Sequence, residues 1–247
     1  MEDKIRNLIT PETLFVVNHS GGKDSQAMYL LLRNLIPASQ FVVIHAHLPE
    51  VEWDGTSDHI QNTIDPGTEF HIVQAVKTFF EMVEHRQLWP SIKNRQCTSD
   101  LKRGPIEKKI KAICNSRGFT TVVNCMGLRA QESINRAAKP AFKQSTTNTN
   151  SKRTWFEWLP IHSWTTGEVF QFIRDNNQKP HWAYQEGMTR LSCCFCIMSS
   201  KQDLKTASRL NPELLARYSA MEKKLDHTLL MPTKKSGKQF LTDIIKS

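Results

Sequence analysis

The chain has 247 residues, 39% of them hydrophobic and 9% aromatic, and a net charge of +9 from 33 basic and 24 acidic residues. This composition excludes an intrinsically disordered chain and predicts a globular α/β protein with a substantial core. No apolar run approaches the roughly 18 residues of a membrane span, and the charged N-terminus lacks a signal peptide's apolar segment. We therefore expect a cytoplasmic protein without a membrane partner. Its positive charge favours nucleic acid or nucleotides as partners, although a basic protein without such partners has the same composition.

Four short runs rich in β-branched residues predict buried strands. In chain order they lie at 14–18, 41–47, 69–73 and 120–126. Helical patterns lie between and after them, at 24–36, 56–64, 76–85 and 104–118. Continuous apolar runs are typical of strands covered on both faces, and the alternation with helices predicts a doubly wound, mostly parallel sheet. Ligands of such sheets bind at the carboxyl ends of the strands.

The chain beyond the fourth strand is less regular. Residues 137–153 are polar, basic and rich in Thr, Asn and Ser, which indicates a long surface loop, either a mobile lid or a plain linker. The later elements are expected in the order of a strand at 155–161, a helix at 165–177 and a mainly helical basic segment from about residue 201. We expect a nucleotide-binding α/β domain over 1–150 and a C-terminal region with a cysteine cluster and basic helices over 151–247.

The segment SGGKDS follows the first strand directly and opens a helix. Gly21 and Gly22 let the backbone approach a ligand without a Cβ in the way, and the N–H groups of the helix N-terminus form an anion site with the helix dipole. Lys23 adds a positive charge, and Ser20 and Ser25 add hydroxyl donors. The segment therefore predicts a phosphate site, although a turn that simply starts a helix can have the same residues.

Two common phosphate loops are excluded. Val17 stands where a Walker A loop needs a glycine, Asp24 stands where it needs Ser or Thr, and the third glycine of the dinucleotide fingerprint is missing. The segment resembles the PP-loop of the ATP pyrophosphatases. That resemblance implies that ATP is bound with Mg²⁺ and split between its α- and β-phosphates, so that AMP goes to a substrate and pyrophosphate leaves. We expect Lys23 on the leaving phosphates and Asp24 at the metal or the helix start.

Three further segments resemble the branch of that family that contains the phosphoadenosine phosphosulfate (PAPS) reductases. They are CTSDLKRGPI at 97–106, GLRAQESINR at 127–136, and LPIHSWTTGEVFQFI at 159–173 followed by YQEGMTRLSCCFC at 184–196. The resemblance runs in order from about residue 14 to 200. It implies the adenine nucleotide alpha hydrolase-like, PP-loop fold with a mainly helical C-terminal extension.

These segments supply further candidate site residues. Gly127 follows the central strand where ligands bind, and Arg129 and Arg136 are candidates to contact phosphate or a sulfate-like group. Glu132 lies four residues before Arg136 on one helix face and would orient it, and Lys102 would offset charge on the nucleotide. Outside the motifs, each cation would equally fit a solvated surface. The residues expected to act catalytically are Lys23, Asp24 and Arg129.

Four of the six cysteines are candidate metal ligands, whereas Cys114 and Cys125 lie in apolar stretches that predict core positions. Cysteines in a Cys-x-x-Cys pair, completed by a distant thiol, select zinc or an iron–sulfur cluster. The candidates are Cys97, Cys193, Cys194 and Cys196.

In the resembling family, cysteines from these two segments hold a four-iron, four-sulfur cluster (4Fe–4S). We expect Cys97, Cys193 and Cys196 as ligands with Cys194 as the fourth. If Cys194 points away, one iron stays open and can carry a sulfur atom. A structural zinc site is the alternative.

The resemblance breaks at one point. Sulfonucleotide reductases of this family carry a nucleophilic cysteine in a C-terminal Glu-Cys-Gly-x-His tail, and the last cysteine here is Cys196. We therefore expect an ATP pyrophosphatase that adenylylates an acceptor for sulfur incorporation, as in DNA phosphorothioation or RNA thiolation, with a cysteine desulfurase or another sulfur donor. The alternatives are a PAPS or APS reductase that uses another thiol and a nucleotide-binding module without turnover. The sequence is also compatible with a homodimer.

Overall fold

The computed structural model of the protein describes residues 2–232 and 237–246. The chain divides into two compact units, each assembled from separate stretches of sequence. Unit 1 comprises Met1–His45, Thr56–Val73 and Ile106–His181, and unit 2 comprises Ala46–Gly55, Gln74–Pro105 and Trp182–Ser247. The expected boundary between residues 150 and 151 lies inside unit 1, and the roles assigned to the two expected parts stay predictions.

A six-stranded sheet with the order β3-β2-β1-β4-β6-β5 forms the centre of unit 1. Its strands are β1 (Thr13–Asn18), β2 (Phe41–Ala46), β3 (Glu69–Val73), β4 (Thr121–Cys125), β5 (Phe142–Gln144) and β6 (Thr154–Trp158). β1 pairs in parallel with β2 and with β4, and β4 pairs in parallel with β6. The five strands expected from the sequence are all present, and the mostly parallel α/β fold is confirmed.

The prediction of one long loop over 137–153 is partly wrong, because this segment contains the edge strand β5. β5 pairs antiparallel with β6, and the ring of Phe142 stacks on that of Phe156 with centroids 5.2 Å apart. Lys143 and Gln144 of the strand are exposed. A three-residue edge strand with polar side chains has too short an alternation to be recognised from composition.

Helical segments of four or more residues follow in the order α1 (Glu2–Arg6), α2 (Lys23–Leu32), α3 (Thr56–Thr63), α4 (Phe79–Arg86), the π-helical η2 (Ser99–Arg103), α6 (Gly104–Arg117), α7 (Ile134–Ala137), α8 (Thr166–Asp175), α9 (Lys201–Leu210), α10 (Pro212–Leu225) and α11 (Leu241–Lys246). Shorter helical turns are η1 (Ala38–Gln40), α5 (Gln96–Thr98), η3 (Ala130–Glu132) and η4 (Trp182–Tyr184). Within the described residues, none of the helices is long and apolar enough to cross a membrane.

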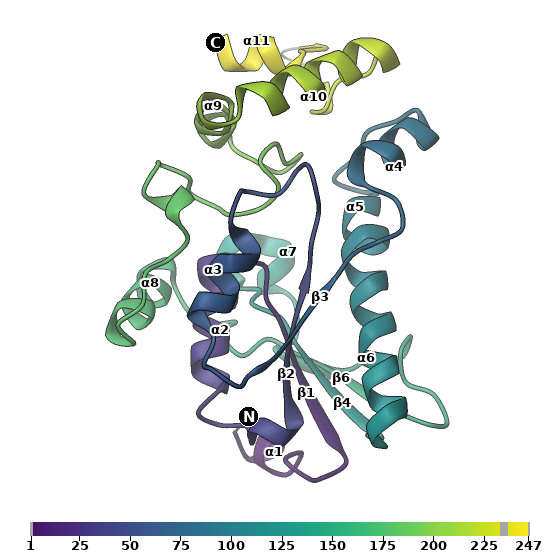
Figure 1. Cartoon of the computed structure of the whole chain (residues 1–247), viewed down its shortest axis with the longest axis vertical. Helices are drawn as coiled ribbons and strands as arrows, with labels where there is room; N and C mark the ends of the chain where they lie inside the picture. Colours follow the sequence, from purple (N-terminus) through teal and green to yellow (C-terminus); the bar gives the residue numbers. More distant parts are fainter. Residues whose placement is uncertain (1, 233–236, 247) are drawn as a thin grey trace. The chain divides into compact units, whose positions relative to one another are not determined.

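Helices cover both faces of the sheet in unit 1, as Figure 1 shows. On one face, Ile110 of α6 packs with Val16 and other buried strand residues. On the other face, Met28 of α2, Ile60 of α3 and Ile173 of α8 are completely buried. The strands are therefore covered on both sides, which explains why their sequences are continuous apolar runs.

Unit 2 has a hydrophobic core of its own, which includes Phe195 and Tyr218. The buried carboxylate of Glu222 on α10 accepts hydrogen bonds from the backbone N–H groups of Leu229 at 2.7 Å and Leu241 at 2.9 Å. These bonds fix the start of α11 against α10. Residues 233–236 and 247 of the expected basic C-terminal segment lie outside the described residues.

Candidate functional site

The candidate phosphate site begins where β1 ends. The chain turns at Gly21, whose φ of +77° is a left-handed conformation that glycine adopts without a steric penalty. α2 starts at Lys23, and its N-cap residue Gly22 has no side chain that could cap the helix. The first intrahelical bond runs from the Gln26 N–H to the Gly22 carbonyl at 3.0 Å. An uncapped helix start behind a glycine turn is suited to an anion.

Several loop groups are bonded within the loop itself. The Ser20 N–H donates to Ser25 Oγ at 3.1 Å, and the Gly21 N–H donates to His19 Nδ1 at 3.1 Å. Ser25 Oγ in turn donates to the Gly22 carbonyl at 2.9 Å. Ser25 therefore holds the loop in shape in this structure, and its expected contact with a ligand stays a prediction.

His19 is a neutral part of this framework. Its ring is buried, and burial, followed by the charges of His45 and His59, lowers the pKa of His19 to about 3. Because Nδ1 accepts the Gly21 N–H, the neutral ring carries its proton on Nε2, which has no hydrogen-bond partner among the described residues. His19 lies directly before the SGGKDS segment, and this position predicts a supporting or packing role beside the loop.

The neighbouring strand β4 supplies the second side of the site. Gly127 follows β4, and a Cβ on this residue would lie 3.0 Å from the backbone carbon and oxygen of Asp24 and 3.1 Å from the Ser25 nitrogen. These distances are shorter than nearly all real Cβ contacts, so any larger residue would force the backbone at Asp24 to move by a few tenths of an ångström. The pairing of β1 with β4 thus brings the segments SGGKDS and GLRAQESINR into contact. Both segments follow the carboxyl ends of their strands, where parallel sheets bind ligands.

Arg129 is buried, with 3% of its surface exposed, and its guanidinium is bonded within unit 1. Its Nε donates to Asp24 Oδ1 at 2.6 Å. Its other nitrogens donate to Gln131 Oε1 at 3.0 Å, the Trp164 carbonyl at 3.2 Å and Thr166 Oγ1 at 3.1 Å. Arg129 therefore joins the loop after β4, the segment before α8 and the start of α2.

Both carboxylate oxygens of Asp24 are paired. Oδ1 accepts from Arg129, and Oδ2 accepts from Lys23 Nζ at 2.9 Å. Lys23 is itself only 4% exposed. In this arrangement Asp24 positions two cations, and the catalytic roles expected for these three residues stay predictions.

The expected ion pair between Glu132 and Arg136 is present. Glu132 also accepts the backbone N–H of Arg129 at 2.9 Å, which fixes the loop after β4. The Arg136 guanidinium is therefore oriented by Glu132, as the spacing of four residues predicts. Its contact with phosphate stays a prediction.

Unit 2 contains the four cysteines expected to bind a metal, all of them free thiols. Cys97 lies in α5, and the other three lie in the loop before α9. Burial, followed by the charges of Cys196 and Cys97, raises the pKa of Cys193 to about 12 against the opposing effect of Lys102. Cys196 likewise raises the pKa of Cys97, after burial. Three of the expected ligands thus lie within electrostatic reach of one another.

Cys194 differs from these three thiols. It is completely buried in the core of unit 2, and its N–H donates to the Val51 carbonyl at 2.9 Å. Its pKa is raised first by burial and then by the charges of Cys193 and Glu52. We call Cys97, Cys193 and Cys196 the thiol triad; Cys194 differs from them in being completely buried, although Cys97 and Cys193 pack against the same core.

The spacing of the thiols bears on which metal they fit. No three cysteine sulfurs of the described chain lie within 4.8 Å of one another. A tetrahedral zinc ion with Zn–S bonds of about 2.3 Å needs thiolate sulfurs about 3.8 Å apart. A cluster in which each thiolate binds a different iron holds its ligand sulfurs farther apart than a single ion does. The described sulfurs therefore do not form a ready site for a single zinc ion and would have to move together to bind one.

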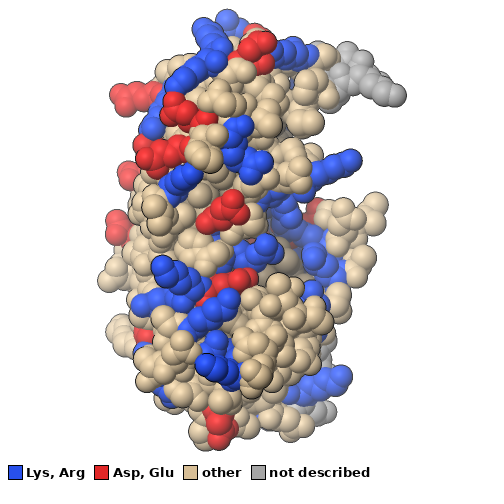
Figure 2. Space-filling view, turned by 90° about the vertical axis from the view of Figure 1, so that its right-hand side faces the viewer, with Lys and Arg blue, Asp and Glu red and all other residues tan. Residues whose placement is uncertain are grey.

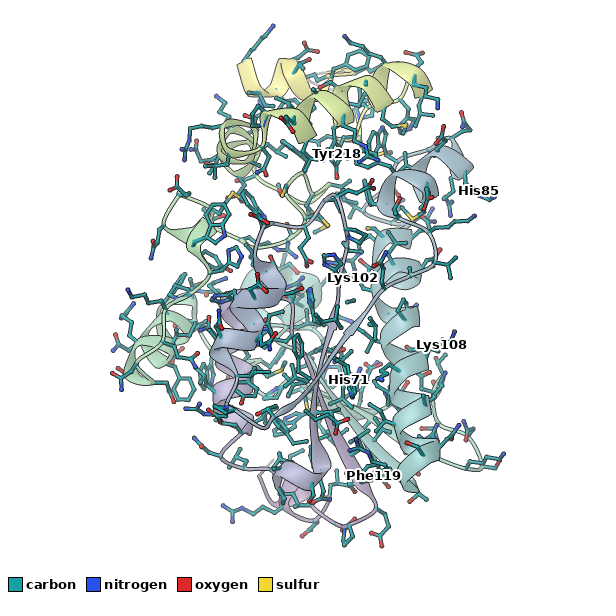
Figure 3. All side chains as sticks on the ribbon, in the orientation of Figure 1. His71, His85, Lys102, Lys108, Phe119 and Tyr218 are labelled. Atoms are coloured by element: carbon teal, nitrogen blue, oxygen red, sulfur yellow. The ribbon has the colours of Figure 1, made fainter. Side chains whose placement is uncertain are left out.

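Lys102, which is labelled in Figure 3, lies within electrostatic reach of these thiols. Burial alone would lower the pKa of its ammonium, but the charges of Cys193, Cys196 and Glu52 raise it. Lys102 therefore stays protonated beside these thiols. Its expected contact with the nucleotide stays a prediction.

Comparison with known proteins agrees with the motifs. Residues 14–199 match the phosphoadenosine phosphosulfate reductase domain family. An uncharacterised 37.8 kDa protein of Escherichia phage 186 is 31% identical over 145 residues, which are 59% of this chain and 42% of the phage protein. The chain spans less than half the length of the curated relatives it matches.

Two solved structures align with this chain. A variant of Candida glabrata FMN adenylyltransferase aligns with a TM-score of 0.50 and 13% identity, over 75% of this chain and 55% of that chain. A Candida auris phosphoadenylyl-sulfate (PAPS) reductase in complex with phosphate aligns with a TM-score of 0.49 and 14% identity, over 77% of this chain and 85% of that chain.

Proposed function

We propose, from the premise that the chain belongs to the phosphoadenosine phosphosulfate reductase domain family, that it activates an acceptor for sulfur insertion. ATP reacts with an acceptor oxygen, the bond between the α- and β-phosphates breaks, and the acceptor becomes an AMP ester while pyrophosphate leaves. A sulfide equivalent then displaces AMP. The acceptor class that the basic composition favours is nucleic acid, either DNA or RNA.

The observation that carries this proposal is the framework around the start of α2. Gly127 brings β4 against the backbone of Asp24, and Arg129 joins Asp24 to the segment before α8. The glycine turn and the helix N-terminus are thereby held in place before any ligand arrives. Preorganised N–H groups of this kind stabilise charge that develops on a leaving group without a reorganisation cost. Here that group is pyrophosphate.

Lys23 is the side chain that would meet the leaving phosphates. Its ammonium pairs with Asp24, which orients it next to the loop. Mg²⁺ bound to the β- and γ-phosphates would neutralise further charge. Asp24 acts through Lys23 and Arg129 and would exchange one of these partners if it bound the metal.

The thiol triad supports a cluster rather than a purely structural metal. Cys97, Cys193 and Cys196 would hold three irons of a four-iron, four-sulfur cluster, and Lys102 would offset its negative charge. Because Cys194 lies in the core of unit 2, the fourth iron would have no cysteine ligand from this set. Such a cluster would supply an open iron that can carry the sulfur atom to be inserted, with the persulfide of a cysteine desulfurase as its source and a thiol reductant supplying the two electrons that bring this sulfur to the sulfide level.

The experiment that tests the reaction is a product analysis with Mg-ATP and bulk tRNA or plasmid DNA. We expect AMP and pyrophosphate in equal amounts. Lys23→Ala should reduce their formation by about 100-fold or more, as the removal of one preorganised donor to developing charge does. Lys108→Ala on α6 removes an exposed lysine of unit 1 and should leave the rate unchanged. Formation of ADP and phosphate would contradict the proposal.

Binding to nucleic acid can be tested separately. Lys and Arg side chains lie among Asp and Glu on the face drawn in Figure 2, rather than as one uniformly basic surface. We therefore expect moderate, sequence-independent affinity that falls with salt, since each phosphate contact releases counterions. Affinity independent of salt between 50 and 200 mM (about a fourfold range) would contradict a phosphate-based interface.

A second candidate is reduction of a sulfonucleotide, which the family's description favours. In that reaction a thiol attacks the sulfur of PAPS, and sulfite is later released as the thiol pair is oxidised to a disulfide. Sulfite formation from PAPS with thioredoxin or glutathione would support this candidate over the first. A protein that binds ATP tightly but forms no product in either assay would be a nucleotide-binding module.

A further inference from the structure

The side chain of Tyr218 on α10 is held by aromatic neighbours. Its ring is completely buried and stacks on Trp89 with centroids 5.4 Å apart and an interplanar angle of 10°. The rings of Phe79, Phe80 and Phe195 lie 5.9, 5.0 and 5.1 Å away. These contacts fix the ring without any contribution from the hydroxyl, and a phenylalanine would make all of them.

The hydroxyl of Tyr218 has no hydrogen-bond partner among the described residues, although it is buried. Buried hydroxyl groups almost always have a partner, and an unmet one destabilises the fold. Retaining an oxygen at this place in an aromatic cage therefore indicates a partner that is absent from the polypeptide.

The packing around this ring identifies the partner's place. The ring of Phe195, which stands between Cys194 and Cys196 in the sequence, has its centroid 5.1 Å from that of Tyr218, and Cys97 and Cys193 pack against the same core cluster as Tyr218. Burial, followed by the nearby thiols, also raises the pKa of Tyr218, so the hydroxyl keeps its proton and can act as a donor. Its electrostatic neighbours in unit 2 are the thiol triad and the adjacent Cys194 (Figure 3 labels Tyr218 and Lys102).

We propose that Tyr218 is a positioning residue for the iron–sulfur group, and that its O–H donates a hydrogen bond to a sulfur of the group held by the thiol triad. This inference rests on the proposed function, because it needs the cluster to be present. Tyr218 lies beyond residue 199, where the match to the family ends. It is therefore a feature of this chain's own C-terminal helices.

Tyr218→Phe separates this role from a packing role, because it keeps the ring and removes the oxygen. In the metal-free protein the substitution removes an unsatisfied buried group, so the melting temperature should rise or stay unchanged. In the loaded protein it removes a hydrogen bond that stabilises the more negative, reduced cluster. We expect the ratio of reduced to oxidised cluster at a fixed potential to fall about tenfold. For a one-electron couple this corresponds to a midpoint potential that is lower by about 59 mV.

The test uses the full chain, loaded anaerobically with iron and sulfide, and a redox titration followed by visible absorbance and electron paramagnetic resonance. Tyr29→Phe is the matched control, since it removes a tyrosine hydroxyl whose partners are Thr68 and the Asp65 N–H in unit 1. A potential lowered in Tyr218→Phe alone, at wild-type iron and sulfide content, supports the inference.

Three other outcomes would overturn it. A wild-type potential in Tyr218→Phe at full iron content removes the role of Tyr218 and leaves the proposed function intact. A wild-type protein that takes up no iron and sulfide removes the cluster as well, and with it the sulfur-carrying part of the proposed function. If Tyr218→Phe loads poorly, the metal-free melting temperature decides: a lower value than wild type shows that the hydroxyl has a partner within the chain.

Discussion

Gly127→Ala is predicted to damage the nucleotide site through a single added methyl group. The new Cβ would lie 3.0 Å from two backbone atoms of Asp24, whereas ordinary contacts begin near 3.4 Å. The start of α2 would have to move by a few tenths of an ångström, and both segments are backbone rather than flexible side chains. Overpacking of this kind costs about 1–3 kcal/mol, which corresponds to a melting temperature lower by about 2–12 °C in a chain of this length.

The same displacement moves the N–H groups that we assign to the phosphates. A loss of about 1.4 kcal/mol in binding is a tenfold weaker affinity, so we expect ATP binding to weaken at least that much. Calorimetric titration with ATP and thermal unfolding measure the two effects on the same protein.

Gly167→Ala is the matched control in unit 1. Its Cβ would have Thr165 Oγ1 as its nearest neighbour at 3.9 Å, an ordinary contact, and it lies within α8. Replacing a helical glycine by alanine stabilises by about 0.4–1 kcal/mol when no strain results. The steric account is refuted if Gly127→Ala melts and binds ATP like the wild type, or if Gly167→Ala is damaged equally.

Three further outcomes are expected. The pKa of His19 is about 3 in the folded chain, whereas its ordinary value is 6.5. As the pH falls, the unfolded chain therefore takes up a proton on His19 before the folded chain does. Stability should therefore fall as pH drops from 6.5 toward 3, by up to about 1.4 kcal/mol per pH unit, and His19→Asn should flatten this slope in urea denaturation at pH 5–7. Arg129→Met leaves the Asp24 carboxylate paired with Lys23 alone and should cost about 1–3 kcal/mol, and this cost should be smaller in an Asp24→Asn background; an equal cost in both backgrounds would argue against the pairing. Cys193→Ser should lose bound iron whereas Cys194→Ala retains it, and an iron assay showing the reverse would place Cys194 in the ligand set.

Much of the fold could be predicted because it depends on local patterns. A strand such as β1 is buried on both faces and therefore reads as an uninterrupted apolar run, and the break at Gly21 and Gly22 marks the turn into α2. The neighbouring segment at Gly127 could be placed near that turn because ligand sites of parallel sheets lie at strand ends. β5 was missed because an edge strand with exposed Lys143 and Gln144 has no such pattern.

The detailed bonding of the site could not be predicted, since it depends on partners that are distant in the sequence. Arg129 is bonded to the Trp164 carbonyl and Thr166 Oγ1, about 35 residues away, so nothing local distinguishes it from an arginine that faces a ligand. Cys193 and Cys194 are adjacent and chemically identical, and only the folded chain shows that Cys194 is completely buried whereas Cys193 is half-buried. Tyr218 carries no motif at all, and its unpaired hydroxyl is visible only in the folded chain.

The central claim is that ATP cleavage by this chain serves sulfur insertion into an acceptor. The most direct measurement is anaerobic incubation of the iron- and sulfide-loaded protein with Mg-ATP, a cysteine desulfurase, ³⁵S-cysteine, a reductant, and bulk tRNA or plasmid DNA. We predict radioactive sulfur retained in the nucleic acid, dependent on ATP and equal in amount to the AMP formed, and lost in Lys23→Ala. AMP formation without sulfur in either nucleic acid would contradict the account, as would sulfur retention that does not require ATP.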